Sequence, residues 1–294
     1  MTIREVLINI RERLQNAGIE DFEYESWAFL DWKLHINRAE FYMNPNGEVK
    51  EELLAELESV LKQREQRVPL QYLMGECEFM GYDFYVDERV LIPRQDTECL
   101  VELAVEDIRN IKTQNRCESN NTADRKNEQK VKVLDLCTGS GCIGISVAKL
   151  CPDTEVTLAD ISEGALSVAK KNAQNLDAGV TLIKGNLFEN IEGRFDYILS
   201  NPPYIPPSVI EGLMPEVRLH EPMLALDGGQ DGLEFYRRIA GQAVTRLAPN
   251  GRLFLEIGCE QAAAVAEILQ KQGYREVQVF QDLAGKDRIV QCIV

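Results

Sequence analysis

The chain has 294 residues, of which 45% are hydrophobic and 27% are charged, and its formal net charge is −16. This length and composition allow two domains with hydrophobic cores and exclude a fibrous or membrane-embedded chain. The acidity argues against a large nucleic-acid footprint, which needs clustered Lys and Arg, and favours a protein substrate.

Eight cysteines are scattered along the chain without a Cys-x-x-Cys pair, and only two histidines are present. This pattern predicts reduced thiols in a cytoplasmic protein. It also leaves little material for a His-based zinc site or a Ser-His-Asp triad, so we expect no metal. No apolar run approaches the roughly 20 residues of a transmembrane helix, and neither export nor membrane insertion is expected.

The N-terminal region, residues 2–69, has apolar residues at helical spacing, interrupted by turn signals at 16–18 and 44–47. This pattern predicts a small helical bundle. Substrate docking, a lid and a purely structural role all remain open for it.

Short alternating and aromatic stretches follow between Gly75 and Pro93, including 79–86 and 90–92, and they predict a hairpin that joins two domains. A helix is expected over 97–111. The almost wholly polar segment 112–130 is expected to be a mobile loop.

From Val131 onward, strand-like and helix-like stretches alternate, which predicts a doubly wound, largely parallel α/β sheet. The expected strands are 131–136, 155–159, 180–183, 197–200, 252–257, 277–281 and 289–293, and the expected helices are 143–150, 164–173, 233–247 and 261–272.

A glycine-rich turn, Cys137-Thr138-Gly139-Ser140-Gly141, follows the first of these strands. Glycines allow a sharp turn and a close approach to a ligand at the carboxyl edge of the sheet. Asp160 ends the next strand, where a carboxylate can bind both ribose hydroxyls. Both features suit S-adenosylmethionine and a nicotinamide dinucleotide equally, so an oxidoreductase remains an alternative at this point.

Two further positions bear on the choice of cofactor. Asp135, just before the turn, can orient the loop and face the cationic methionyl end of S-adenosylmethionine, whereas it would lie badly beside a pyrophosphate. At the third strand end, Asn186 and Leu187 can offer an amide and apolar surface to adenine, although a structural loop fits that segment nearly as well.

The segment Asn201-Pro202-Pro203-Tyr204 is the most informative, because it follows a buried strand beside the expected cofactor crevice. An amide or aromatic amino nitrogen is a poor nucleophile. If the Asn201 side-chain oxygen and the Pro202 carbonyl accept its two N–H groups, that nitrogen is oriented toward a methyl group and its developing charge is offset. Tyr204 can stack on the flat acceptor. These residues predict a methyltransferase acting on a planar nitrogen.

These motifs and several flanking segments resemble the protein-(glutamine-N5) methyltransferases, in particular the release factor methyltransferases of the PrmC/HemK type. The similar segments are 69–76, 91–98 (Leu-Ile-Pro-Arg-Gln-Asp-Thr-Glu), Glu221-Pro222, 225–233, 255–258 and 282–288. The resemblance covers nearly the whole chain. Gln95 and Cys137 depart from it, because the family usually has proline and glycine there, and Asn186 stands where aspartate is frequent.

The resemblance implies a seven-stranded Rossmann-like methyltransferase sheet in residues 96–294, a helical substrate-docking domain in 1–74 and a hairpin linker in 75–95. It implies methylation, from S-adenosylmethionine and without a metal, of the glutamine in the Gly-Gly-Gln motif of peptide chain release factors, a step that bears on translation termination. S-adenosylhomocysteine would be the product, and a monomer is expected.

The resemblance also assigns roles to residues. Asn201, Pro202 and Tyr204 would be catalytic and would hold the glutamine together with Pro203 and Arg94. The cofactor would be bound by Asp135, Cys137, Thr138, Gly139, Ser140, Gly141, Asp160, Asn186, Leu187 and Asn201. A glutamine methyltransferase for a ribosomal protein, a nucleic-acid amino-methyltransferase with the same turn, and a non-catalytic adaptor remain as alternatives.

Overall fold

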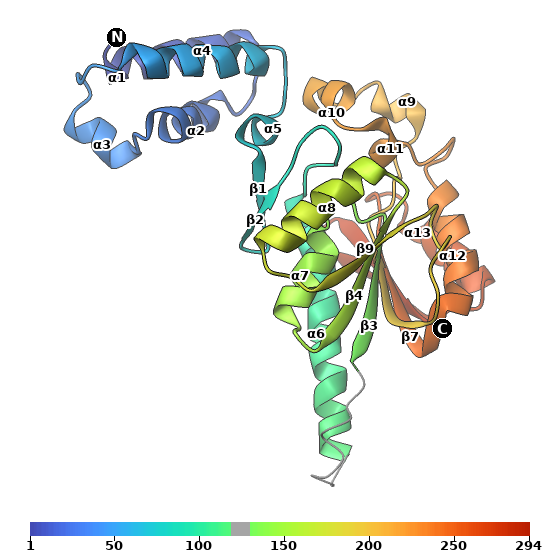
Figure 1. Cartoon of the computed structure of the whole chain (residues 1–294). Helices are drawn as coiled ribbons and strands as arrows, with labels where there is room; N and C mark the ends of the chain where they lie inside the picture. Colours follow the sequence, from blue (N-terminus) through green and yellow to red (C-terminus); the bar gives the residue numbers. More distant parts are fainter. Residues whose placement is uncertain (119–129) are drawn as a thin grey trace. The chain divides into compact units, whose positions relative to one another are not determined.

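The computed structural model describes residues 1–118 and 130–294, which divide into two compact units (Figure 1). The first unit contains residues 1–76 together with 214–220, and the second contains 77–213 and 221–294. The sequence did not suggest that residues 214–220, so far along the chain, pack with the first unit.

The first unit is a helical bundle, as predicted. Its helices are α1 (Ile3–Asn16), α2 (Phe22–Leu34), α3 (Arg38–Met43), α4 (Glu51–Glu65), α5 (Leu70–Met74) and α10 (Pro215–His220). The apolar face of α1, including Ile10 and Leu14, packs against α2 and α4 around Leu30 and Leu61. Helix α1 starts at a capping box, in which the Thr2 hydroxyl and the Glu5 carboxylate each accept a backbone N–H of the other residue.

A buried ion cluster holds α10 within this unit. Arg64 donates to both carboxylate oxygens of Glu25, at 2.7 and 2.9 Å, and to Glu216 at 2.9 Å. Arg67 donates to the other oxygen of Glu216 at 2.6 Å. Burial by itself would raise the pKa of Glu216, but hydrogen bonds from Arg67 and Arg64 outweigh it, and the pKa lies below its usual value.

A hairpin of β1 (Glu76–Phe79) and β2 (Tyr82–Tyr85) lies at the start of the second unit, with Glu76 as the last residue of the first. Met80 and Gly81, at its turn, both have positive φ, which is the backbone that a two-residue type I′ turn requires. The hairpin is therefore confirmed, but it is shorter than predicted. Residues 90–92 form no strand.

The main sheet has seven strands in the order β5-β4-β3-β6-β7-β9-β8. These are β3 (Val131–Leu136), β4 (Thr154–Asp160), β5 (Val180–Lys184), β6 (Phe195–Ser200), β7 (Leu247–Glu256), β8 (Arg275–Gln281) and β9 (Asp287–Ile293). Neighbours from β5 to β7 pair in parallel, and β9 pairs antiparallel with β7 and β8. The predicted doubly wound, largely parallel sheet is confirmed.

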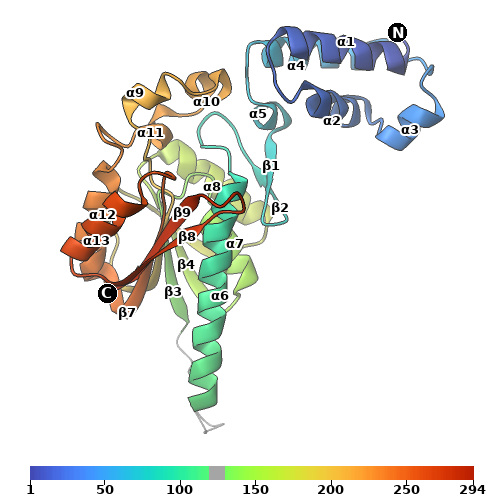
Figure 2. The same cartoon turned by 180° about the vertical axis from the view of Figure 1, so that it is seen from behind.

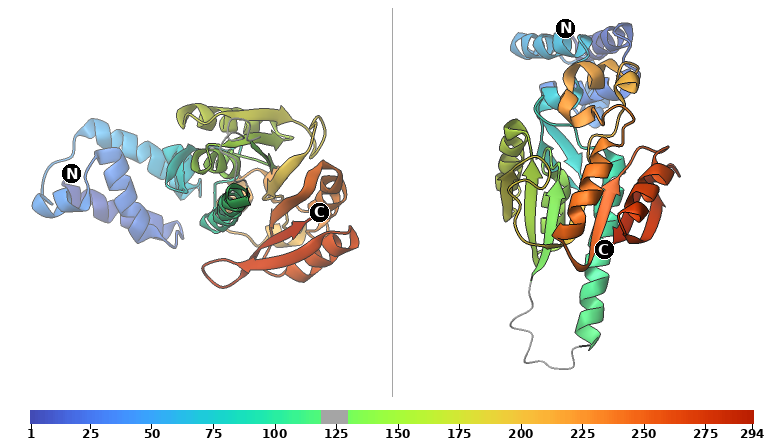
Figure 3. Two further views of the ribbon diagram at one scale, coloured as in Figure 1. Left: turned by 90° about the horizontal axis from the view of Figure 1, so that it is seen from below. Right: turned by 90° about the vertical axis from the view of Figure 1, so that its right-hand side faces the viewer.

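Helices cover both faces of this sheet (Figures 2 and 3). Helices α6 (Gln95–Glu118), α7 (Cys142–Leu150) and α8 (Glu163–Asn175) pack on one face, and α12 (Glu234–Arg246) and α13 (Ala262–Lys271) on the other. Two short helices, α9 (Pro207–Ile210) and α11 (Met223–Leu226), lie between β6 and α12 in the sequence. Alternation along β3 places Val133 in the core under α6 and α7, and Leu134 in the core under α12 and α13.

Helix α6 corrects the sequence prediction that a loop begins at residue 112. The helix continues to Glu118, because the polar segment 112–118 contains no glycine or proline and is rich in residues that favour helices. Residues 119–129 of the predicted loop lie outside the described part of the chain. No helix within 1–118 and 130–294 is long and apolar enough to cross a membrane.

Candidate active site

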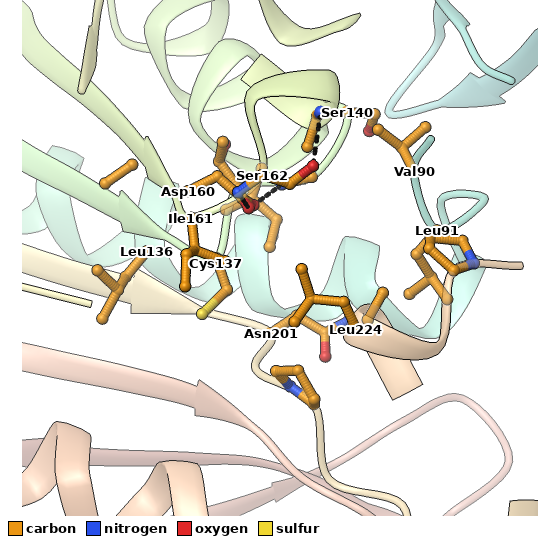
Figure 4. Close-up of a pocket in the computed structure, with 18 of the residues that line it drawn as sticks. Val90, Leu91, Leu136, Cys137, Ser140, Asp160, Ile161, Ser162, Asn201 and Leu224 are labelled. Atoms are coloured by element: carbon orange, nitrogen blue, oxygen red, sulfur yellow. Dashed lines mark hydrogen bonds between the residues drawn. The ribbon is translucent and has the colours of Figure 1, made fainter. Parts of the chain in front are cut away.

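A cavity of about 270 Å³ lies at the carboxyl ends of β3, β4, β5 and β6, inside the second unit (Figure 4). Parallel α/β sheets bind ligands at this edge. Most of the residues predicted for the site line it, namely Arg94, Cys137, Thr138, Gly139, Ser140, Asp160, Asn186, Leu187, Asn201 and Pro203. Asp135, Gly141, Pro202 and Tyr204 belong to the same segments but are not among the lining residues.

Asp135, at the end of β3, is hydrogen-bonded to the glycine-rich turn and to the start of α7. One of its carboxylate oxygens accepts the Thr138 hydroxyl at 2.5 Å and the Gly144 N–H at 2.9 Å, while the other oxygen is buried without a hydrogen-bond partner. Burial raises the pKa of Asp135 to about 7, although these two hydrogen bonds oppose the shift. Asp135 thus ties the loop to the start of α7, and its second oxygen is left without a hydrogen-bond partner.

Asp160 lies at the end of β4 and borders the cavity. Its carboxylate accepts the N–H of Gly139 at 2.9 Å and that of Ser162 at 2.8 Å, which fixes its position beside the loop. Burial raises the pKa of Asp160, and the backbone donors oppose that shift. Ile161 follows it, half-exposed and lining the cavity, and offers apolar surface next to the carboxylate (Figure 4).

Cys137 occupies a position that favours glycine. Its φ is 62°, in the left-handed region that a non-glycine residue rarely adopts. Cysteine at this position therefore carries local strain that a glycine would avoid. Burial raises the pKa of the Cys137 thiol, so it is a poor nucleophile and acts as an apolar lining group.

Asn186 has a partner that the sequence did not indicate. Arg238 of α12 donates to the Asn186 side-chain oxygen at 2.6 Å, which leaves the amide NH₂ for a ligand. The Arg238 guanidinium lies 5.4 Å from the centre of the Phe235 ring, and both residues line the cavity together with Leu187. The face predicted for adenine is therefore formed partly by α12.

The Asn201-Pro202-Pro203-Tyr204 turn begins where β6 ends. The Ser200 hydroxyl donates to the carbonyl of Leu136 at 2.6 Å, which ties this strand end to the start of the glycine-rich loop. The Asn201 side-chain NH₂ donates to the Thr97 hydroxyl at 3.3 Å. Pro202 and Pro203 are buried. The turn and the loop are thus held together at one edge of the sheet.

The backbone of Tyr204 is fixed from two sides. The side-chain NH₂ of Gln261 donates to the Tyr204 carbonyl at 3.0 Å, and Gly228 packs so closely that a Cβ there would lie 2.5 Å from the Tyr204 Cα. Glycine at 228 is required by this approach. The Tyr204 ring packs against the core under α12, and burial raises its pKa to about 12.

Arg94 forms an ion pair beside the cavity. Its guanidinium donates to the Glu221 carboxylate at 2.6 Å, and the Glu221 side chain is 1% exposed whereas that of Arg94 is 39% exposed. Burial raises the pKa of Glu221, and Arg94 opposes that shift. Arg94 therefore keeps part of its surface for a ligand while one of its N–H groups is already engaged.

Sequence reasoning missed several residues that shape the site. Thr97, Ile161, Leu224, Phe235 and Arg238 line the cavity, and Asn172 holds the loop by donating to the Ser140 carbonyl at 2.9 Å. Thr97 lies in the segment 91–98, which carries part of the family resemblance, but the others lie in no segment that points to the site. In the described part of the chain, no group of three or more His, Cys, Asp or Glu side chains is arranged to hold a metal ion.

Comparison with known proteins gives matches over both units. Residues 5–75 match the family described as PrmC N-terminal domain, and residues 122–212 match the one described as Methyltransferase small domain. The Release factor glutamine methyltransferase of Geobacter sulfurreducens is 40% identical over 98% of this chain and 95% of its own. The enzyme of the same name from Clostridium acetobutylicum is 39% identical over 100% and 99% of the two chains.

Among solved structures, a methyltransferase from Pyrococcus furiosus is similar with a TM-score of 0.51 and 18% identity. The similarity covers 79% of this chain and 97% of that one. At this identity the match supports the methyltransferase fold alone.

Proposed function

The chain belongs to the family of release factor glutamine methyltransferases, and from this premise we propose that it methylates the side-chain N5 of a release factor glutamine with S-adenosylmethionine. The observation that carries the proposal is that one cavity is bordered by the glycine-rich loop, Asp160 and Asn201. A methyl donor and a planar acceptor nitrogen would meet there. We take the acceptor to be the glutamine of the Gly-Gly-Gln motif.

The residues around the loop fit the methyl donor. Gly139 has φ +54° and nothing within 4 Å of its Cβ position, so its backbone is open to a ligand. Asp160 offers a carboxylate to ribose hydroxyls, and the unpartnered oxygen of Asp135 favours a nearby ammonium group. When bound, S-adenosylmethionine supplies a methyl group already activated by its sulfonium, so neither a metal nor a strong base is needed.

Asn201 and Pro202 would orient the acceptor. The glutamine amide nitrogen carries two N–H groups and a delocalised lone pair. The Asn201 side-chain oxygen and the Pro202 carbonyl would accept those N–H groups, which directs the nitrogen toward the methyl and stabilises the positive charge that develops on it. Pro203 and Tyr204 would shape the turn, and Arg94 would contact the backbone of the release factor next to the glutamine.

The net charge of −16 disfavours a nucleic-acid substrate, and we propose that the helical unit docks the release factor. We also propose that the chain acts as a monomer in the cytoplasm.

The acceptor is tested by incubating the purified chain with labelled S-adenosylmethionine and, separately, with release factor, ribosomal protein and DNA. Label is expected on the release factor. Label confined to the ribosomal protein or to DNA would refute the proposal.

A further inference from the structure

A buried chain of hydrogen bonds runs behind the Asn201 amide. The Thr97 hydroxyl, at the start of α6, donates to the Glu256 carboxylate at the end of β7 over 2.6 Å. The Asn201 NH₂ in turn donates to the Thr97 oxygen at 3.3 Å. Thr97 is 3% exposed and Glu256 is 1% exposed, so water does not compete for these groups.

The number of protons in this chain determines its direction. A threonine hydroxyl has one proton, and here the Glu256 carboxylate accepts it, because a carboxylate in its ionised form cannot donate. Toward Asn201 the hydroxyl can then only accept, so the NH₂ end of the amide must face Thr97. The side-chain oxygen of Asn201 is thereby left for the cavity.

We propose that Thr97 and Glu256 are positioning residues that fix the Asn201 amide with its oxygen toward the acceptor nitrogen. This inference rests on the proposed function, in which that oxygen accepts an N–H of the glutamine. With the amide turned over, the Asn201 NH₂ would face the N–H groups of the glutamine. Two hydrogen-bond donors would then meet, and the glutamine amide would be repelled rather than held.

The surroundings of Glu256 support this role. The Tyr236 hydroxyl donates to the Glu256 backbone carbonyl at 2.9 Å, which fixes the strand end. Burial raises the pKa of Glu256 to about 7, with the Thr97 hydrogen bond, Arg288 and Arg94 lowering it and Asp96 raising it. In an assay at about pH 8 the carboxylate is therefore mostly ionised and acts as an acceptor.

The first test compares turnover of the full-length chain on release factor at saturating S-adenosylmethionine. Thr97→Val removes the hydroxyl, and we expect kcat to fall at least about tenfold while S-adenosylhomocysteine affinity is retained. Thr97→Ser keeps the hydroxyl and should restore most of the turnover. The matched control is Thr154→Val, which removes another buried hydroxyl. That hydroxyl donates to the Cys151 carbonyl at 2.7 Å, and Thr154 does not line the cavity.

The second test detects the direction of the amide. In Glu256→Gln the new NH₂ group can donate to Thr97, whose proton is then free for the Asn201 oxygen, so the amide can turn over. A release factor with Gln→Glu in its Gly-Gly-Gln motif presents a carboxylate, which the wild-type Asn201 oxygen repels and a turned NH₂ attracts. We expect this competitor to inhibit Glu256→Gln more strongly than the wild type.

The outcomes separate the two proposals. No labelling of release factor by the wild type would refute the proposed function. If the wild type labels release factor, either of two results would overturn the positioning role. One is an unchanged kcat in Thr97→Val, and the other is equal inhibition of Glu256→Gln and the wild type by the Gln→Glu release factor. If Thr97→Val fails to fold, the comparison of Glu256→Gln with the wild type decides.

Discussion

Replacing glycine by alanine at Gly144 and at Gly241 should distinguish a glycine that packing requires from one that it does not. Gly144 lies in α7 above Asp135, and a Cβ there would lie 2.3 Å from Leu158 Cδ2 and 3.0 Å from the Asp135 carboxylate oxygen. Ordinary carbon contacts are roughly 3.5–4.0 Å, so Gly144→Ala forces Leu158 or α7 to move. Gly241 in α12 has nothing within 4 Å of the same position and is the matched control.

The expected magnitudes follow from this geometry. Both substitutions gain about 1 kcal/mol of helix propensity. Gly144→Ala also costs about 1–3 kcal/mol of overpacking, so it should be less stable than Gly241→Ala by that amount. For a unit of this size, the difference corresponds to a gap in Tm of roughly 2–4 °C per kcal/mol.

Thermal unfolding and S-adenosylhomocysteine titration check both consequences. Because Asp135 accepts the Gly144 N–H and the Thr138 hydroxyl through one oxygen, displacement of α7 should also disturb the loop and weaken cofactor binding. Gly241→Ala should bind like the wild type. Equal Tm and equal affinity in the two variants would show that the reasoning about this packing is wrong.

Two further predictions concern buried charges. Arg64→Leu leaves the buried Glu25 carboxylate without its partner and Glu216 with Arg67 alone, and should destabilise the helical unit by about 3–5 kcal/mol in denaturant unfolding. Lys271→Ala removes an exposed ion pair and should unfold close to the wild type, so similar losses in both variants would contradict the account. The raised pKa of Asp135 means that the folded state binds its proton more tightly than the unfolded state, so the resulting stability is present at low pH and is lost as pH rises through about 7. Asp135→Asn should therefore gain stability relative to the wild type as the pH rises from about 4 to about 7, and a difference in Tm that stays constant over this range would exclude this role.

The alternation of strands and helices could be predicted from the sequence because apolar periodicity is local. Helix α6 ran further than expected because polarity was taken as a loop signal, whereas residues 112–118 lack a helix breaker. The short helices α9 and α11 were not predicted, since they are too brief to show a period.

The site was predictable to the extent that it lies in contiguous motifs. Thr97 and Glu256 are 159 residues apart in the sequence, and only the fold brings the start of α6 to the end of β7. The contact of Arg238 with Asn186 likewise depends on how α12 packs on the sheet. Such pairs leave no local pattern in a single sequence. The left-handed backbone at Cys137 was likewise hidden, because cysteine gives no sign of it.

The most direct measurement of the central claim is mass spectrometry of the release factor after reaction with the wild type and with Asn201→Ala. The account predicts one added methyl on the Gly-Gly-Gln glutamine with the wild type, and none with Asn201→Ala, even though that variant still binds S-adenosylhomocysteine. A methyl on another residue, or near-normal methylation by Asn201→Ala, would contradict it.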